Sequence, residues 1–280
     1  MSIKGRSIRF LPEQFREFDE RDIIWLWQHL KKDGFEPGDS HSGDVDALTR
    51  QVGRFLRGHD SLNHDAIFEA KLISMVGGDD LKSIDKGNPR ILSFLINVLR
   101  YKFGFDFNDP VVNSCLDDWF FFTAILDCSN KPLVDKKTAL KEGLMLWSLN
   151  SLHDHIFEWF DEKDGDQGLW LLDQAEKSSL PKSIEGRANF PVNVKQRFVK
   201  FKCLMDQSGL PGDFKKTYMA ELKRKWRAKG RIKSKGKFQS NVLVTKETKE
   251  GIERLKKEYG LKTRGEVIDR LVSRAVGNQP

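Results

Sequence analysis

The most highly charged stretch of the sequence is a run of lysines and arginines toward its C-terminal end. Positions 223–237 hold nine basic residues and no acidic one in fifteen positions. A solvent-exposed helix face usually mixes both signs of charge, whereas an unbroken positive run suits the phosphate backbone of DNA. Trp226 lies inside the run, where it either anchors a helix to the rest of the protein or lies against sugar. We expect phosphate contacts from Lys223, Arg224, Lys225, Arg227, Lys229, Arg231, Lys233, Lys235 and Lys237.

The net charge of +7 is unevenly distributed along the chain. Residues 211–280 contain 20 Lys and Arg against 8 Asp and Glu, which gives +12, and the remaining 28 against 33 give −5 for residues 1–210. A mildly acidic body joined to a strongly basic region is typical of a protein that holds a polyanion at one end. We therefore divide the chain into a body, 1–210, a basic helix and flexible arm, 211–237, and a C-terminal domain, 238–280.

Three elements are predicted in the C-terminal domain. Residues 238–244 alternate with a period of two, as a short half-buried strand does. Thr245 can N-cap a following helix, and Gly260 can end it. Thr263 and Glu266 have the spacing of a capping box at the start of a second helix. One strand and two helices leave an unpaired strand edge and little apolar surface for a folded monomer, so the domain is expected to pair with a second copy.

In the order and lengths of these elements, residues 238–280 resemble the ribbon-helix-helix family of prokaryotic DNA-binding proteins. The resemblance implies that two copies pair their strands into an antiparallel ribbon, which enters the major groove of double-stranded DNA. It also implies that the chain is a homodimer or a higher homo-oligomer. The alternative is that residues 241–244 form an edge strand of a larger α+β domain.

By position, the resemblance implies base contacts from Gln239, Asn241 and Leu243. Amide side chains suit this role because Asn and Gln can bond bidentately to the edge of adenine, while Leu243 would touch a thymine methyl group or cover the groove floor. Thr263 and Arg264, at the start of the second helix, would bind a phosphate. The dimer core would consist of Val242, Val244, Ile252, Leu255, Val267, Ile268 and Leu271.

The body is predicted to be helical. Asn88 before Pro89 has the pattern of an N-cap followed by proline in the first turn, and Asp135 and Asp213 are further candidate N-caps. Two segments are apolar nearly all round, as helices in the middle of a bundle are. Helices are expected at 22–32, 44–58, 63–76, 90–103, 111–126, 135–149, 169–177, 193–207 and from 213 onward. The predicted fold class is mainly α, with a helical bundle-like domain followed by a ribbon-helix-helix domain.

A competing hypothesis places an enzyme in the body. A metal-dependent phosphohydrolase of the HD type has His and Asp residues in a set order along the chain. His64 and Asp65, with His29 or His41 before them and Asp118 or Asp127 after them, match that order. The residues after Asp65 lack the small and basic side chains usual in that family. The sequence also contains no glycine-rich phosphate loop and no nucleophile elbow. We therefore expect no enzyme activity, no cofactor and no metal.

The composition, with 39% hydrophobic and 11% aromatic residues, is typical of a globular chain with ample material for a core. No apolar run is long enough to span a membrane, and residues 1–10 lack the apolar segment of a signal peptide. Cys115, Cys128 and Cys203 are few, odd in number and far apart, which indicates buried free thiols in a reducing cytoplasm. We expect a cytoplasmic, nucleoid-associated bacterial protein without membrane contact.

The function predicted from these features is sequence-specific DNA binding by a prokaryotic or mobile-element transcriptional regulator. The alternative use is plasmid or chromosome partition, or organisation of the chromosome. The body is expected to serve self-association, sensing of a small-molecule effector or contact with a protein partner, and the sequence leaves these three open.

Overall fold

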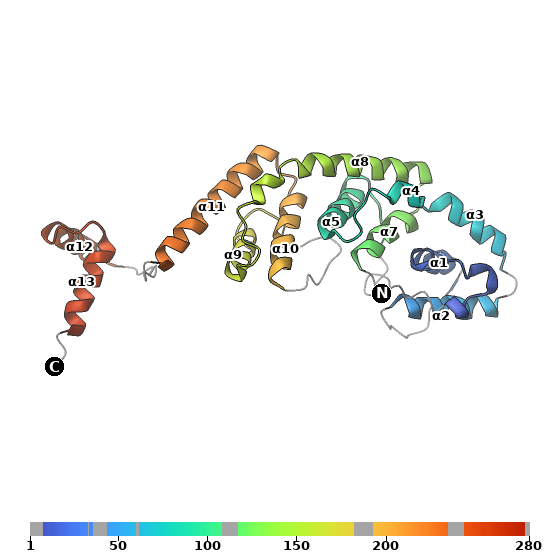
Figure 1. Ribbon diagram of the computed structural model, residues 1–280, viewed down its shortest axis with the longest axis horizontal. Helices are drawn as coiled ribbons and strands as arrows, with labels where there is room; N and C mark the ends of the chain where they lie inside the picture. Colours follow the sequence, from blue (N-terminus) through green and yellow to red (C-terminus); the bar gives the residue numbers. More distant parts are fainter. Residues whose placement is uncertain are drawn as a thin grey trace. The chain divides into compact units, whose positions relative to one another are not determined.

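The computed structural model describes residues 8–32, 34–35, 44–59, 62–107, 117–181, 193–234 and 244–277. The chain divides into two compact units, Met1–Trp226 and Arg227–Pro280, and helix α11 (Gly212–Ser234) belongs to both. Figure 1 labels the helices of each unit. The predicted helical body is confirmed for the residues that the structure describes.

The N-terminal part of the first unit encloses one hydrophobic core. Helix α1 packs on α2 and α7, and α5 packs on α7 and α8; α8 runs along one side of the unit (Figure 1). Fully buried aromatic and aliphatic side chains such as Phe15, Trp27 and Phe122 fill the space between these helices. The elements are η1 (Ile8–Phe10), η2 (Glu13–Phe15), α1 (Glu20–Lys32), α2 (Val45–Gly58), α3 (His64–Ser74), α4 (Gly78–Leu81), α5 (Pro89–Asn97), η3 (Val98–Lys102), α7 (Asp118–Cys128) and α8 (Leu133–Ser151).

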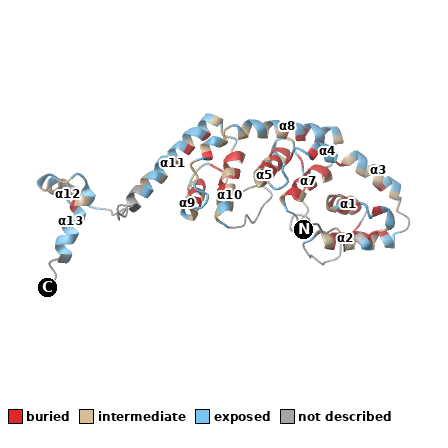
Figure 2. Cartoon of the chain, in the orientation of Figure 1, coloured by how far each residue is buried: buried red, intermediate tan, exposed pale blue. Residues whose placement is uncertain are grey.

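A second core lies in the C-terminal part of the same unit. It is formed by η4 (Asp154–Phe157), α9 (Gly165–Glu176), α10 (Val194–Gln207) and the first half of α11. Phe198 and Phe201 of α10 are fully buried in it, and α10 also packs on α5 of the first core. Figure 2 shows buried positions on the facing sides of these helices.

A buried ion pair ties three segments of the first core together. The Arg21 guanidinium donates to both carboxylate oxygens of Asp127, at 2.6 and 2.8 Å, and to the Val76 carbonyl oxygen at 2.7 Å. The fully buried Lys136 donates its Nζ hydrogens to the carbonyl oxygens of Ser74, at 2.8 Å, and Asp127, at 2.6 Å. Burial raises the pKa of Asp127 and lowers that of Lys136, because both charged forms lose hydration.

The structure confirms several helix starts that the sequence predicts. Asn88, ahead of proline, accepts a hydrogen bond from the Arg90 amide, and Asn193 forms a capping box with Gln196. Two predicted caps were wrong, because α8 begins at Leu133, before Asp135, and α11 begins at Gly212, before Asp213. Helix α7 begins after Asp117, and the residues before it that were expected to be helical, 111–116, lie outside the described ranges.

The second unit contains helices α12 (Lys246–Glu258) and α13 (Arg264–Gly277), which pack on each other. Thr245 caps α12 by accepting a hydrogen bond from the Thr248 amide, as predicted. Gly260 ends the helix with φ +60°, a left-handed conformation that glycine adopts without steric cost. The capping box is also confirmed, since the Thr263 hydroxyl accepts from the Glu266 amide at 3.2 Å.

The predicted ribbon-helix-helix domain is corrected by the structure. Within the described ranges the chain is helical and has no β-strand. Val244, the last residue of the predicted strand, is in no regular element, and residues 238–243 lie outside the described ranges. A strand is stable only when its backbone hydrogen bonds are paired, and no described segment is extended beside Val244 to pair with it.

Helix α2 passes close to the N-terminal segment at Gly53. A Cβ added there would lie 2.0 Å from the carbonyl oxygen of Phe10. Because the obstacle is backbone, we expect Gly53→Ala to lower the free energy of unfolding by about 1–3 kcal/mol, as overpacking does. Urea denaturation measures this loss. Gly58→Ala, at the end of the same helix, adds a Cβ that meets nothing within 4 Å, so equal losses in both variants would contradict the explanation.

Two of the cysteines fall in the described ranges. Cys128 and Cys203 are free; Cys203 is buried, as expected, whereas Cys128 is only partly buried. Burial raises the pKa of both thiols, that of Cys203 to about 12. Cys115 lies outside the described ranges. Among the described helices, none combines the length and apolar character that crossing a membrane would require.

Candidate nucleic-acid interface

Helix α11 is partly buried as far as Trp226 and is not buried from there to Gly230. In its first half Lys215, Met219 and Leu222 are buried, and Met219 and Leu222 belong to the second core. The Trp226 ring lies 5.2 Å, centroid to centroid, from the ring of Trp170 on α9. Of the two roles considered for Trp226, anchoring to the body is therefore the one that the structure shows. Beyond Trp226 no residue as far as Gly230 is buried, which Figure 2 shows as exposed or intermediate ribbon.

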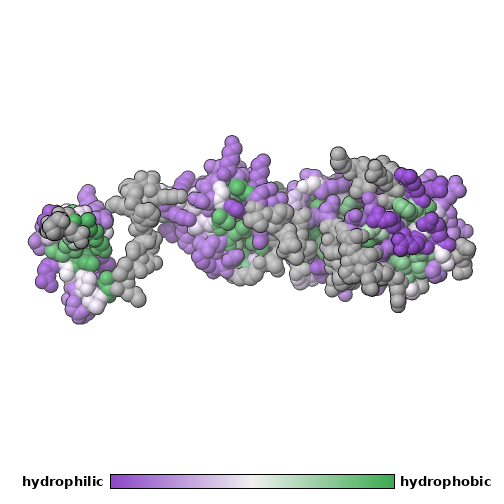
Figure 3. All heavy atoms as spheres, turned by 90° about the horizontal axis from the view of Figure 1, so that it is seen from below, coloured by the Kyte–Doolittle hydropathy of each residue, from purple (hydrophilic) through white to green (hydrophobic). Residues whose placement is uncertain are grey.

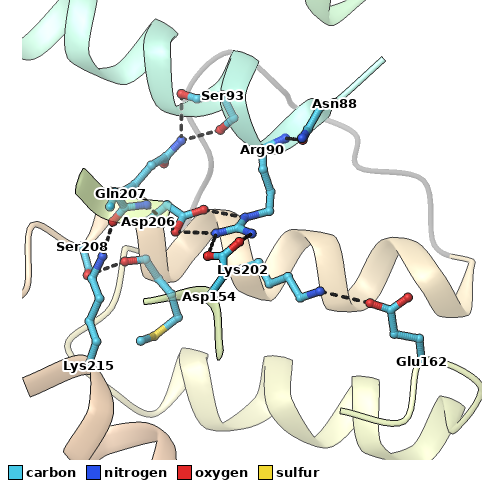
Figure 4. A network of polar contacts seen from close by, with 12 residues as sticks. Asn88, Arg90, Ser93, Asp154, Glu162, Lys202, Asp206, Gln207, Ser208 and Lys215 are labelled. Carbon is cyan, nitrogen blue, oxygen red and sulfur yellow. Dashed lines mark hydrogen bonds and ion pairs between the residues drawn. The ribbon is translucent and has the colours of Figure 1, made fainter. Parts of the chain in front are cut away.

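A network of charged side chains fixes the start of α11 to the body. Arg90 of α5 lies between two carboxylates, as Figure 4 shows. Its Nε donates to Asp206 Oδ2 at 2.8 Å, and its Nη1 donates to Asp154 Oδ2 at 2.8 Å. Asn150 donates to Asp206 Oδ1 at 2.8 Å and accepts from Lys215 Nζ at 2.7 Å. The network thus joins α5, α8, η4, α10 and α11.

The charges in this network stabilise one another in a poorly hydrated place. The side chains of Arg90 and Asp206 are only 12% and 4% exposed. Burial alone would lower the pKa of Arg90, but the hydrogen bonds to Asp206 and Asp154 raise it above its usual value. Burial lowers the pKa of Lys215, and the nearby Asp206 opposes that change. Every carboxylate here is already paired, so the network is structural rather than a ligand site.

We define the basic half of α11 as residues 223–234. Arg224, Lys225, Arg227 and Lys229 are exposed, and Lys223 is half-buried. Lys225 forms an ion pair with Glu221 at 2.7 Å; both side chains are about half exposed, so a phosphate can replace Glu221 at little cost. Arg231 and Lys233, two of the expected phosphate contacts, have a helical backbone. The helix therefore extends through part of the segment that was expected to be a flexible arm. Lys235 and Lys237 lie outside the described ranges.

The other predicted phosphate site, at the start of α13, is occupied by side chains of the same unit. The Glu266 carboxylate accepts hydrogen bonds from the amides of Lys262, at 2.8 Å, and Thr263, at 3.2 Å. Arg264 donates to the Glu253 carboxylate on α12. A phosphate would have to displace Glu266 and compete with Glu253, so this helix start is a weaker anion site than the basic half of α11.

The residues predicted to read bases, Gln239, Asn241 and Leu243, lie outside the described ranges, as does Val242 of the predicted dimer core. Their assignment depended on the ribbon. The remaining core positions other than Val244 lie in the helix pair α12 and α13. Val267 is fully buried, Ile252 and Leu255 are half-buried, and Val244, Ile268 and Leu271 are exposed by 49%, 47% and 38%.

Two of the residues considered for a metal-dependent phosphohydrolase contact other side chains. His64 Nδ1 lies 2.7 Å from Gln14 Nε2, and its ring packs edge-on against Phe15. Asp127 pairs with Arg21. No group of three His, Cys, Asp or Glu side chains able to hold a metal is found in the described part of the chain, and His41 lies outside it.

The network around Arg90 could not be found from the sequence, because Arg90 and Asp206 are 116 positions apart and neither belongs to a motif. The basic run, by contrast, is visible in the sequence as charge alone. No protein-family model, no curated protein and no solved structure matches the chain.

Proposed function

We propose that the protein binds double-stranded DNA through the basic half of α11. The observation that carries the proposal is a continuous helix that is anchored in the body by its first half and lined with lysine and arginine in its second. Residues 227–280 hold 15 Lys and Arg against 6 Asp and Glu, a net +9. A polyanion is the partner that such a surface attracts most strongly.

The chemistry of the same helix favours a duplex over other polyanions. Proteins that bind single strands stack bases on aromatic side chains, and the only aromatic residue from Lys223 to Lys237 is Trp226, which packs on Trp170. Binding flat on an anionic membrane requires an apolar helix face. From Arg227 to Lys237 the one large apolar side chain in the sequence is Ile232. With single strands and membranes disfavoured, the lysine and arginine side chains of this helix are best suited to contact the phosphates of a double helix.

The proposal is tested by measuring the affinity of the purified protein for a labelled duplex across a salt series. We expect log affinity to fall linearly with log salt, with a slope of about −0.9 for each phosphate contact. A single strand of the same length should bind more weakly. Absence of binding at about 0.05 M salt would overturn the proposal.

We propose that the protein binds DNA to regulate transcription at the nucleoid. Plasmid or chromosome partition is the second proposed role. Genome-wide mapping of the bound sites separates them. Binding at a few promoters supports regulation, and one centromere-like array supports partition. Many dispersed sites would contradict both and indicate a chromosome-organising protein.

We further propose that the second unit forms a homodimer through an apolar face of α13. Its members Ile268, Val272 and Val276 follow one another at intervals of four residues and are exposed by 47%, 54% and 66%. Figure 3 shows hydrophobic surface gathered on this unit. Val267 is the only fully buried side chain in its described part. A unit with so small a core gains stability by covering that face.

We expect Val272→Asp to weaken the dimer. Burying a valine contributes about 1.5 kcal/mol or more, so the dissociation constant should rise at least about tenfold. Sedimentation equilibrium of the full chain measures it. Ser273→Asp, next to it on the same helix and also exposed, is the matched control and should leave the dimer intact. A wild-type chain that is monomeric at every concentration would contradict the dimer.

A further inference from the structure

Four basic residues of α11 lie in two rows on opposite sides of the helix. Lys223 and Arg227 are four residues apart and lie on one side, and Lys225 and Lys229 lie on another. Because two residues turn the helix by about 200°, the two rows point in nearly opposite directions. A helix lying on a flat anionic surface would need only one row.

The two sides of the helix that lie between these rows differ from each other. Trp226 lies on the side where α11 packs on the body, against Trp170. On the side away from Trp226, between the two rows, lie Arg224, which is exposed, and Ala228, a small residue. The helix therefore presents, in angular order, a row of positive charge, an edge that carries Arg224 and, two turns further on, position Arg231, and a second row of positive charge.

We propose that the basic half of α11 lies in the major groove of B-form DNA, with one basic row on each phosphate wall and Arg224 directed at the base edges. This rests on the proposed function. The major groove is about 12 Å wide and admits a single α-helix, whose diameter is about 10–12 Å. Only a groove places phosphates on both sides of a helix at once. Arginine on the groove floor recognises guanine, and a small residue beside it permits the close approach.

The experiment compares two row variants in the full chain, Lys223→Gln with Arg227→Gln, and Lys225→Gln with Lys229→Gln. Each is expected to flatten the plot of log duplex affinity against log salt by about 1.8, which corresponds to about 50-fold weaker binding at about 0.1 M salt. Lys82→Gln with Lys177→Gln removes the same charge from exposed positions of the body and should leave the slope unchanged. Circular dichroism verifies that each variant is folded.

The result that overturns the inference is a loss confined to one row, which would place the helix on the outside of the duplex and leave DNA binding itself intact. Failure of the wild-type chain to bind any duplex would instead overturn the proposed function. Arg224→Gln supplies the second readout. It should change the sequences enriched from a random duplex pool, because contacts to bases discriminate, whereas the row variants should weaken all sequences alike. An unchanged preference would refute the role of Arg224. Duplex RNA, whose major groove is deep and narrow, should bind weakly.

Discussion

Replacing Asp206 by asparagine is expected to lower the free energy of unfolding by about 3–5 kcal/mol, the usual cost of leaving a buried charge without its partner. Asp206 accepts hydrogen bonds from Arg90 Nε at 2.8 Å, Arg90 Nη2 at 3.0 Å and Asn150 at 2.8 Å. The variant retains the shape of the side chain but loses its negative charge, so Arg90 retains only Asp154, whose side chain is 45% exposed. Chemical denaturation followed by circular dichroism measures the loss.

Asp79→Asn is the matched control for this substitution. Asp79 pairs with Lys82 at 2.6 Å, but their side chains are 90% and 78% exposed. An exposed ion pair contributes about 0–1 kcal/mol, so a change of that size or less is expected. If Asp206→Asn were as mild as Asp79→Asn, the network around Arg90 would not be what holds α11 to the body.

Neutralising four positions of α11 together is expected to have the largest effect on DNA binding. In the chain with Lys223, Lys225, Arg227 and Lys229 all changed to glutamine, up to four phosphate contacts are lost. Each contact contributes about 0.9 to the salt slope, so affinity at about 0.1 M salt should fall by between three and four orders of magnitude. Fluorescence anisotropy with a labelled duplex measures the change.

The folded body provides the control for this variant. Lys225, Arg227 and Lys229 are exposed and Lys223 is half-buried, and the second core is formed by other residues, so the midpoint of thermal unfolding should stay close to that of the wild type. An affinity within tenfold of the wild type would show that the basic half of α11 is not the main contact. DNA binding would then have to be assigned to the helix pair α12 and α13.

What the sequence determined by itself is the local structure and the distribution of charge. Thr245, Thr263 and Asn193 were identified as helix starts, and the structure confirms all three. An N-cap bonds to an amide two or three residues away, so the signal and its partner lie in the same short window. The failures at Asp135 and Asp213 are of one or a few residues, because an acidic residue in the first turn is also favourable to the helix dipole.

What only the tertiary structure decided is which distant residues meet. A strand at residues 238–244 requires a second strand to pair with. A period-two pattern carries no information about such a partner, and the described residues contain no strand that could be one. The sequence showed Trp226 within a basic run; packing decided that it meets Trp170. Likewise the sequence gives no reason for Arg90 to meet Asp206, 116 positions away. Burial makes such charges pair, and burial is a property of the packed helices rather than of any short stretch of chain.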